Sequence, residues 1–395
     1  MNFNEVKKVK TAVVGCGMIS NIYIRNLLQL FSVIDLVAVA DINRAAAEEK
    51  AKTYGVPKVM TVDEVAADEE IELVVNLTAP FAHYTVIKQM LEAGKNVYTE
   101  KMFTTELEDA RELCRLADER RLYLGVAPDT VLGAGIQTAR RIIDSGLIGE
   151  VTSGFVSVTR NQNLNSEIYR FLQRDGGSIL YDVGVYYVGA LISLFGTVKS
   201  VRGYGAPALM HEKEILFADN KDSWQIPGNN VIAAGLQFKN GALVSVHLNG
   251  NAAGSETRAL CIYGTKGTLE LGDPNSFNGY VKLILPEGKP VEIPFTHGYD
   301  GRNMVSEPSP FDGYGNRGIG VAEMAWAMRQ NRPSRLSKEF GLHCEEVLVG
   351  ITEAVTSGQT YELKSECEVK PLAQGYYSSI FDGTARGDAE KSLIN

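Results

Sequence analysis

The sequence predicts a two-part α/β protein. An N-terminal, doubly wound parallel sheet is followed by an α+β part with a large open, mostly antiparallel sheet. Apolar runs alternate with helix-like segments over the first 126 residues, and a glycine-rich turn follows the first run. Beyond residue 150, strand-like segments joined by hairpin signals dominate instead. These three observations define the predicted fold class.

The N-terminal strands are predicted from the runs "TAVVG", "IDLVAVAD", "IELVVN", "NVYTE" and "LYLGVA". Helix-like segments such as "NIYIRNLLQL" and "AHYTVIKQMLEAG" separate them. Continuous apolar strands with intervening helices are typical of a parallel sheet covered on both faces. Ligands of such sheets bind at the carboxyl ends of the strands. We therefore look for a site where these runs end.

The first run ends in a glycine loop that opens a helix. Gly15 permits a tight turn, and Gly17 lets backbone amides approach a pyrophosphate at the helix N-terminus. The third position of the G-x-G-x-x-G pattern is Ser20 rather than glycine or alanine, so the pattern is imperfect. We expect the loop to bind a dinucleotide through Gly15, Gly17, Met18 and Ile19.

Asp41 ends the second apolar run. A carboxylate at this position can accept hydrogen bonds from the ribose 2′-hydroxyl and would repel a 2′-phosphate. The predicted cofactor is therefore NAD rather than NADP, although the nearby Arg44 weakens this preference. The alternative interpretation is that Asp41 is an ordinary surface acid.

Two further strand ends carry polar residues. Thr78, Pro80 and His83 follow the run "IELVVN", and Pro80 suits the first turn of a helix. Glu100 and Lys101 follow "NVYTE". All five residues are candidates for cofactor binding because the strand ends share one edge of the sheet. For His83, a packed histidine on a helix is the alternative.

Lys101 is also a candidate for proton transfer. A lysine that is partly desolvated in a cofactor crevice has a lowered pKa and can exchange protons near neutral pH. At an arbitrary strand tip, a solvated lysine would be the better interpretation. The predicted crevice favours the functional one.

The predicted parts are residues 1–128, which bind the cofactor, residues 129–372, which bind substrate and form oligomer contacts, and a tail at 373–395. Asp129 is predicted to cap a helix that runs to Gly146. Hairpins are predicted at "KNG", "GTKG" and "PEGK", and helices at "GIGVAEMAWAMRQ" and near residues 339–357. One sheet face would be exposed unless another subunit covers it, so a homo-oligomer is expected.

Asp182 lies in the apolar, helix-like run "SILYDVGVYYVGALISLFG". A carboxylate in such surroundings is costly without a partner, and Lys101 is the candidate partner. Tyr186 is four residues further on, so both side chains point to one face of the helix. The alternative is that Asp182 is a helix cap or forms a purely structural ion pair within its own domain.

Composition excludes several other classes of function. The 395 residues include 39 basic and 48 acidic side chains, for a net charge of -9, and no basic tract. Nucleic acid and anionic membranes are therefore poor partners. Five cysteines without a Cys-x-x-Cys pattern, and no histidine pair at ligand spacing, predict no disulfide framework and no metal. With no signal-peptide core or spanning segment, the sequence predicts a cytoplasmic protein.

Taken together, the motifs resemble those of the Gfo/Idh/MocA oxidoreductases. These motifs are Gly15-x-Gly17, Thr78-x-Pro80-x-x-His83, Glu100-Lys101 and Asp182-x-Gly184-x-Tyr186. The resemblance implies a Rossmann domain and an open-sheet domain, NAD(P), and oxidation or reduction of a carbinol of a sugar, inositol or related polyol. It further implies that Lys101 positions the nicotinamide and transfers a proton, while Asp182 contacts substrate and lysine.

Two residues depart from the family pattern. Met102 stands where proline is usual, and Tyr186 stands where a histidine usually acts as acid or base. Tyrosine, with a reference pKa of about 10, is a weak base but a good hydrogen-bond donor. The base is then expected to be Lys101 or another histidine. His297, in the loop "PFTHGYDG", is the candidate, and a solvent-facing turn histidine is the alternative.

The resemblance implies a NAD-dependent dehydrogenase of a secondary alcohol of a sugar or glycoside. The Tyr-Tyr motif, together with "GYGNRGIG", is most similar to a branch that oxidises the 3-hydroxyl of glucosides, including plant C-glycosides. One alternative is glycoside cleavage by oxidation and elimination, with a base such as His297. Another is a non-catalytic NAD-binding sensor.

Overall fold

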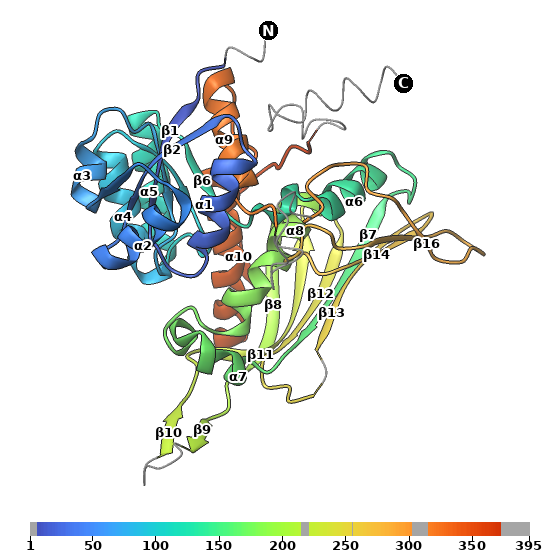
Figure 1. Ribbon diagram of the computed structural model, residues 1–395. Helices are drawn as coiled ribbons and strands as arrows, with labels where there is room; N and C mark the ends of the chain where they lie inside the picture. Colours follow the sequence, from blue (N-terminus) through green and yellow to red (C-terminus); the bar gives the residue numbers. More distant parts are fainter. Residues whose placement is uncertain (1–5, 215–220, 255, 302–314, 373–395) are drawn as a thin grey trace.

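The computed structural model describes residues 6–214, 221–254, 256–301 and 315–372. They form two large sheets and a separate two-stranded hairpin, with the long helix α10 (Lys338–Ser357) lying between the two large sheets (Figure 1). The predicted tail at 373–395 lies outside the described residues. None of the described helices is long and apolar enough to span a bilayer.

The first sheet is parallel and has the strand order β3-β2-β1-β4-β5-β6. Its strands are β1 (Val9–Val14), β2 (Ile34–Ala40), β3 (Lys58–Met60), β4 (Leu73–Asn76), β5 (Asn96–Thr99) and β6 (Leu124–Val126). The strand order reverses at β1 and β4, which places the ligand crevice beyond their carboxyl ends. The predicted doubly wound sheet is confirmed. The short edge strand β3 was not predicted.

Helices cover both faces of this sheet because alternate residues of each strand enter different cores. Val13 packs in the core that contains Tyr23 of α1, whereas Val14 packs in the core that contains Ile87 of α4. The connecting helices are α1 (Ser20–Gln29), α2 (Arg44–Tyr54), α3 (Val62–Ala67), α4 (Pro80–Glu92) and α5 (Leu107–Arg120). As predicted, Pro80 occupies the first turn of α4.

The second sheet has the order β16-β15-β14-β13-β7-β12-β11-β8-β17. Its strands are β7 (Val151–Thr159), β8 (Val198–Pro207), β11 (Asn229–Phe238), β12 (Leu243–Asn249), β13 (Thr257–Gly264), β14 (Thr268–Leu271), β15 (Val281–Ile284), β16 (Val291–Glu292) and β17 (Tyr361–Glu362). The pairing is antiparallel except between β7 and β12. The three predicted hairpins are confirmed by the antiparallel pairs β11–β12, β13–β14 and β15–β16.

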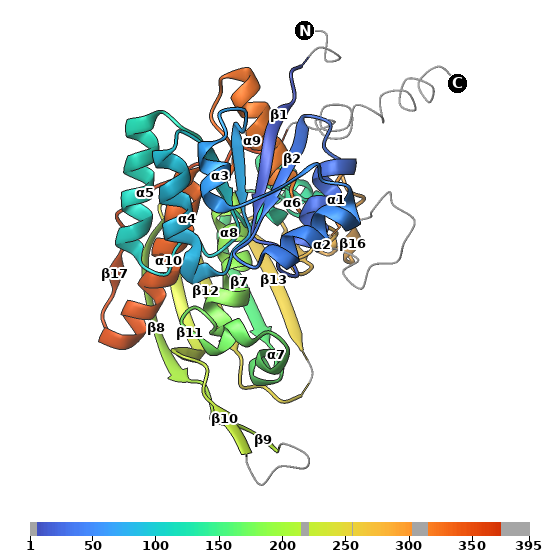
Figure 2. The same ribbon diagram turned by 60° about the vertical axis from the view of Figure 1, so that its left-hand side comes forward.

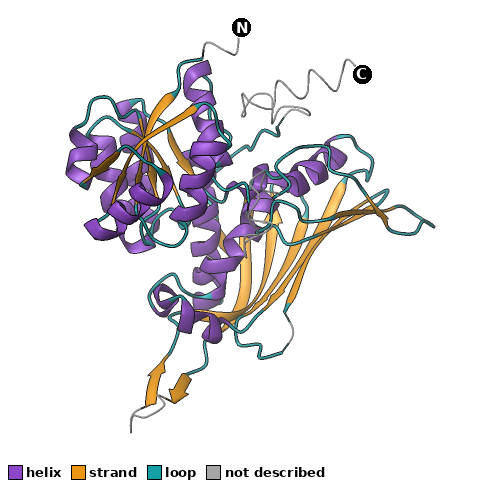
Figure 3. Ribbon diagram, viewed as in Figure 1, coloured by secondary structure: helices purple, strands orange, loops and turns teal. Residues whose placement is uncertain are grey.

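The second sheet is covered by helices on one side only (Figure 3). These include α6 (Ala134–Asp144), α8 (Val185–Phe195) and α10, whereas none of the described helices packs on the opposite face. On that face, Phe155, Leu243 and Tyr263 are 38%, 57% and 39% exposed. They lie close together because Leu243 and Tyr263 both pair with Ser153.

A small hairpin extends away from the body of the molecule, formed by β9 (His211–Glu214) and β10 (Lys221–Trp224) (Figure 2). Its charged sequence, "HEKE", lacks the apolar alternation of a half-buried strand, so it was not predicted. At its base, His211 contacts Glu167 at 2.7 Å, next to α7 (Gln162–Ile168).

The last two helices connect the two sheets. Helix α9 (Ile319–Gln330) packs on β5 and β6, and α10 contacts α5 and β6 on one side and α8 and β8 on the other. The packing is tight, since a Cβ placed on Gly341 would lie 2.4 Å from Val126. The predicted helices in this region are confirmed.

Candidate active site

The glycine loop after β1 is shaped for close approach of a ligand. Gly15 has a φ of +102°, and a Cβ there would lie 2.5 Å from the backbone of Leu77. A Cβ on Gly17 would meet nothing within 4 Å, so this part of the loop is open. The Ser20 hydroxyl donates a 2.6 Å hydrogen bond to Gly17 O. This bond gives serine a structural use at the third position of the pattern.

Asp41 lies beside this loop. Its carboxylate accepts backbone hydrogen bonds from Cys16 and Asn43, each 2.7 Å long, which fixes it at the end of β2. The Arg44 side chain contacts Glu48 at 3.0 Å and does not pair with Asp41 in the described structure. Met18 and Ile19, in the loop itself, are 56% and 40% exposed.

Thr78, Pro80 and His83 cluster at the end of β4. The fully buried His83 places Nδ1 2.5 Å from Met102 O and Nε2 3.0 Å from Thr78 O. His83 thus ties the β4 loop to the segment that carries Lys101. The Lys101–Met102 peptide bond is cis.

Glu100 and Lys101 follow β5, as predicted, but they face different partners. The Glu100 carboxylate accepts a 2.6 Å hydrogen bond from the Tyr23 hydroxyl and a 3.0 Å bond from Lys101 N. The Lys101 ammonium points to a residue beyond the predicted boundary at residue 128. It donates to Asp182 O at 2.7 Å and to Asp182 Oδ1 at 3.2 Å.

Asp182 lies in a one-turn π-helix, Leu180–Gly184, that leads directly into α8. Such turns are frequent at functional sites. Its second oxygen, Oδ2, accepts a 3.1 Å hydrogen bond from Gln162 and lies 3.6 Å from Arg160. Burial alone would raise the pKa of Asp182, but Lys101, Arg160 and Gln162 outweigh it and lower that pKa. Asp182 is therefore a carboxylate at neutral pH.

The pKa of Lys101 is raised, so the prediction of a lowered value is wrong. Burial on its own lowers the pKa of this ammonium, but the neighbouring Tyr186, Asp182 and Glu100 have the larger combined effect. Lys101 therefore carries its proton in the protein alone. It can accept a substrate proton only after that one has left.

Tyr186 lies next to two cations. Its ring centroid is 5.1 Å from Lys101 Nζ and 5.1 Å from the Arg317 guanidinium. Burial raises the pKa of Tyr186, and both cations partly oppose that rise. The phenol is thus a hydrogen-bond donor at neutral pH, in agreement with the sequence analysis.

His297 is not brought to this cluster. Its Nδ1 lies 2.9 Å from Thr296 Oγ1 and its Nε2 3.2 Å from Leu372 O. It is 6% exposed, which also differs from a solvent-facing turn histidine. Within the described part of the chain, no hydrogen bond, ion pair or ring contact links His297 to Lys101 or Asp182.

Asp129 was predicted as a helix cap, and that prediction is wrong. Helix α6 begins only at Ala134, after a short 3-10 turn, and has no side-chain cap. The buried Asp129 carboxylate instead contacts Arg317 at 3.1 Å and accepts a 2.7 Å bond from Gly318 N.

Three residues of the site were not predicted from the sequence: Arg317, Gln162 and Arg160. The glycine-flanked run "GYGNRGIG" was the available signal for the first of them.

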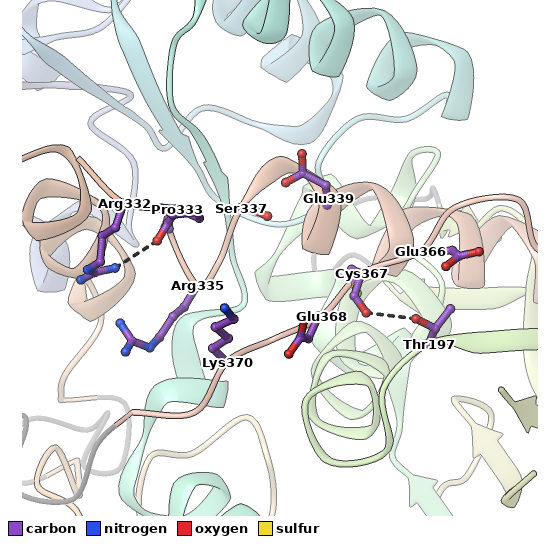
Figure 4. A pocket seen from close by; sticks show the side chains of 11 residues that line it. Thr197, Arg332, Pro333, Arg335, Ser337, Glu339, Glu366, Cys367, Glu368 and Lys370 are labelled. Carbon is purple, nitrogen blue, oxygen red and sulfur yellow. Dashed lines mark hydrogen bonds between the residues drawn. The ribbon is translucent and has the colours of Figure 1, made fainter. Parts of the chain in front are cut away.

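A separate pocket of about 640 Å³ lies between the loop 332–339 and the segment 366–370 (Figure 4). Its lining mixes basic and acidic side chains, and it includes none of the predicted site residues. Several of these charges are already paired, as in the Arg335–Glu323 contact at 2.7 Å. Among the described residues, no three His, Cys, Asp or Glu side chains are grouped as a metal ion would require.

The cofactor-binding part predicted from the sequence, residues 1–128, fits NAD. The open backbone at Gly17 leaves room for phosphates at the N-terminus of α1, whose first turn carries no acidic residue and no side-chain cap. Asp41 is fixed where a ribose would bind, and its charge disfavours a 2′-phosphate. Lys101 follows β5 and so lies at the same edge of the sheet as the glycine loop.

Comparison with known proteins agrees with this fold. The family described as "Oxidoreductase family, NAD-binding Rossmann fold" (GFO_IDH_MocA) matches residues 9–127. The "GFO/IDH/MocA C-terminal domain" matches residues 136–270. Together these matches cover well over half of the chain.

Two relatives match this chain over part of its length. An uncharacterized oxidoreductase of Schizosaccharomyces pombe is 34% identical over 49% of this chain and 53% of its own length. The chain thus spans about half the length of that relative. Inositol 2-dehydrogenase of Rhizobium meliloti is 27% identical over 59% of this chain and 67% of its own length.

A solved structure, a NAD binding oxidoreductase from Klebsiella pneumoniae, superposes with a TM-score of 0.78. The two chains are 19% identical, and the superposition covers 91% of this chain and 100% of the other. This likeness extends the shared fold over both sheets. From the two matched domains and this fold, the chain belongs to the Gfo/Idh/MocA family of NAD-binding oxidoreductases.

Proposed function

We propose that the protein oxidises a secondary hydroxyl of a sugar or glycoside to a ketone, with NAD as hydride acceptor. The observation that carries this proposal is the Lys101–Asp182 contact at 3.2 Å, which joins the end of β5 to the turn before α8. The pair is largely buried, at 14% and 15% side-chain exposure. A charged pair in such a place, next to a cofactor crevice, is an expected feature of a proton-transfer site.

Each residue has a distinct role in this proposal. NAD, when bound, supplies the acceptor for the hydride that leaves the substrate carbon. Lys101 loses its proton to solvent and then takes the proton of the substrate hydroxyl. Asp182 fixes the direction of the Lys101 ammonium through its carbonyl and carboxylate, and Tyr186 donates a hydrogen bond to a sugar hydroxyl. Gln162 and Arg160 keep Asp182 in place.

The proposed substrate carries several hydroxyl groups, because the side chains around Asp182 are polar: Lys101, Arg160 and Gln162. The first position to test for oxidation is the C3 hydroxyl of a glucosyl group in an O- or C-glycoside. We place this activity in the cytoplasm, in a homo-oligomer formed through the uncovered sheet face.

The test is a substrate panel. Purified protein is mixed with NAD and with free sugars, inositols, O-glycosides and C-glycosides, while nicotinamide absorbance and product masses are followed. The expected product is two hydrogens lighter than its substrate. Lys101→Met should lower kcat by at least about a thousandfold, because general-base catalysis is worth roughly that much. Lys88→Met, which removes a partly buried lysine paired with Glu112 on α5, should change little.

Full turnover by Lys101→Met would contradict the mechanism. No product from any panel member, despite NAD binding, would instead favour the sensor alternative. The Lys101–Asp182 pair speaks against that alternative, since a sensor has no need of it. The elimination alternative requires a free base, and the His297 ring nitrogens face Thr296 and Leu372 O.

A further inference from the structure

Arg317 is a buried arginine at the centre of the site, and the proposed function assigns it no role. It lies in the run "GYGNRGIG" just before α9. Its side chain is 3% exposed and forms an ion pair with the fully buried Asp129 at 3.1 Å. A second nitrogen donates to Asn275 Oδ1 at 2.8 Å. The guanidinium is thus held on two sides.

The backbone around Arg317 is fixed as firmly as its side chain. Asn26 of α1 donates to Gly315 O at 2.7 Å and to Arg317 O at 2.8 Å. Asp129 accepts from Gly318 N. A glycine with φ of +99° at position 318 then starts α9. Asn26 thus fixes the backbone at Arg317, while Asp129 and Asn275 fix its guanidinium, which points at a residue at the start of α8.

That residue is Tyr186, whose ring centroid lies 5.1 Å from the guanidinium. The charged groups that act on Tyr186 are Arg317, Lys101, Glu100 and Asp182. Only the first two are cations, and one of them, Lys101, must become neutral to accept a proton. Arg317 keeps its charge at every stage because the pKa of a guanidinium is above about 12. It is the permanent positive charge beside the phenol.

We propose that Arg317 is a positioning residue, which holds Tyr186 beside Lys101 and stabilises negative charge on its phenol oxygen as that oxygen donates a strong hydrogen bond to substrate. The inference rests on the proposed function in that it assumes a substrate oxygen near Tyr186. Its electrostatic part stands without a substrate. A buried phenol without this cation would hold its proton more tightly and donate more weakly.

The first experiment needs no substrate. The codon for Tyr186 is replaced so that 3,5-difluorotyrosine is incorporated there, which gives one 19F resonance and a phenol that ionises at lower pH than tyrosine. We expect Arg317→Met, combined with Asp129→Asn, to raise the pKa of this phenol by about one unit or more. The paired change avoids leaving a bare buried carboxylate at Asp129.

Two further variants complete this experiment. Arg317→Lys keeps a positive charge and should retain most of the wild-type value. Arg335→Met opens another partly buried ion pair, with Glu323, and should leave the Tyr186 resonance unchanged. The proposal is overturned if the Arg317/Asp129 variant titrates as wild type does, or if Arg335→Met has an equal effect. Circular dichroism and NAD binding check that each variant is folded.

A kinetic experiment follows on the substrate that the panel identifies. Arg317→Met with Asp129→Asn should lower kcat several-fold in wild type and cause no further loss in a Tyr186→Phe background, whereas Arg317→Lys should keep most of the activity. Equal losses in both backgrounds would show that Arg317 does not act through the phenol. If the panel yields no substrate, the fluorine titration still decides the electrostatic role. Failure of the proposed function and failure of this inference are therefore distinguishable.

Discussion

At the scale of single residues, the Lys101–Asp182 pair determines how the rate should depend on pH. Acidic neighbours raise the pKa of Lys101, and only the uncharged amine can accept a proton. Oxidation should therefore become faster as pH rises through the alkaline range. Asp182→Asn removes a negative neighbour, which makes the ammonium less favourable and lowers its pKa. The pH range over which kcat/KM rises should then move to lower pH. The maximal rate should fall about tenfold or more because Asp182 no longer orients the Lys101 amine.

The measurement for Asp182→Asn is a pH profile of kcat/KM, which reports the free enzyme. Glu112→Gln is the matched control, since it removes a carboxylate that contacts a different lysine, Lys88, at 2.7 Å. A limb that stays at the wild-type pH in Asp182→Asn would mean that Asp182 does not set the proton affinity of Lys101.

Asp41 should control the choice between the two nicotinamide cofactors. Asp41→Asn removes the charge that repels a 2′-phosphate but can still accept the backbone bonds from Cys16 and Asn43. The ratio of NADP to NAD affinity should rise by about tenfold, or roughly 1.4 kcal/mol. Titration calorimetry with each cofactor measures it. Asp35→Asn, at the opposite end of β2, is the control, and an unchanged ratio in Asp41→Asn would contradict the assignment.

Sequence reasoning found the Lys101–Asp182 ion pair because each partner carries a local signal. Lys101 ends an apolar strand, and Asp182 is a costly carboxylate in an apolar run. It did not identify Gln162, whose position depends on contacts between segments far apart in the chain. For Arg317, the run "GYGNRGIG" marked the segment but not the partners of the side chain. The sign of the Lys101 pKa shift was wrong for the same reason. Burial can be guessed from a pattern, but the number of acids that surround a buried amine cannot.

At the scale of elements, strands with strong apolar runs were predictable and weak ones were not. The five long N-terminal runs became β1, β2, β4, β5 and β6. The three-residue β3 has too short a pattern, and the charged β9–β10 hairpin has none. The supposed cap at Asp129 failed because a distant arginine competes for that carboxylate.

Helix α10 carries a buried acid whose titration should affect stability. Glu345 is 2% exposed, and burial raises its pKa to about 8. Between pH 4.5 and about 8 the folded protein keeps this proton, whereas the unfolded chain loses it. Stability from this group is therefore full below pH 4.5 and falls as pH rises. The loss by pH 7 is about 3 kcal/mol.

Glu345→Gln cannot ionise, so its stability relative to that of wild type should increase from pH 5 to pH 7.5. Urea titrations at the two pH values measure this difference. Glu353→Gln, on an exposed turn of the same helix, should show no such trend. A constant difference between Glu345→Gln and wild type would show that the acid titrates normally.

At the scale of the whole molecule, the uncovered sheet face predicts self-association. Phe155, Leu243 and Tyr263 lie together on that face, where partly exposed aromatic and aliphatic side chains favour contact with a second copy. We expect a solution mass that is a multiple of 43.1 kDa, by light scattering after size-exclusion chromatography. Phe155→Glu with Leu243→Glu should lower it to one chain. Thr257→Glu, at the exposed start of β13, is the matched control, and a single-chain wild type would refute the prediction.

The return of α9 and α10 to the first sheet limits how this protein could be recombined with its relatives. A chimera that joined the cofactor half of one protein to the remainder of another at residue 128 would place foreign helices on β5, β6 and α5. The Gly341–Val126 contact leaves no space for a larger side chain there. An experiment that exchanges the cofactor-binding part between relatives should therefore transfer residues 319–357 together with residues 1–128.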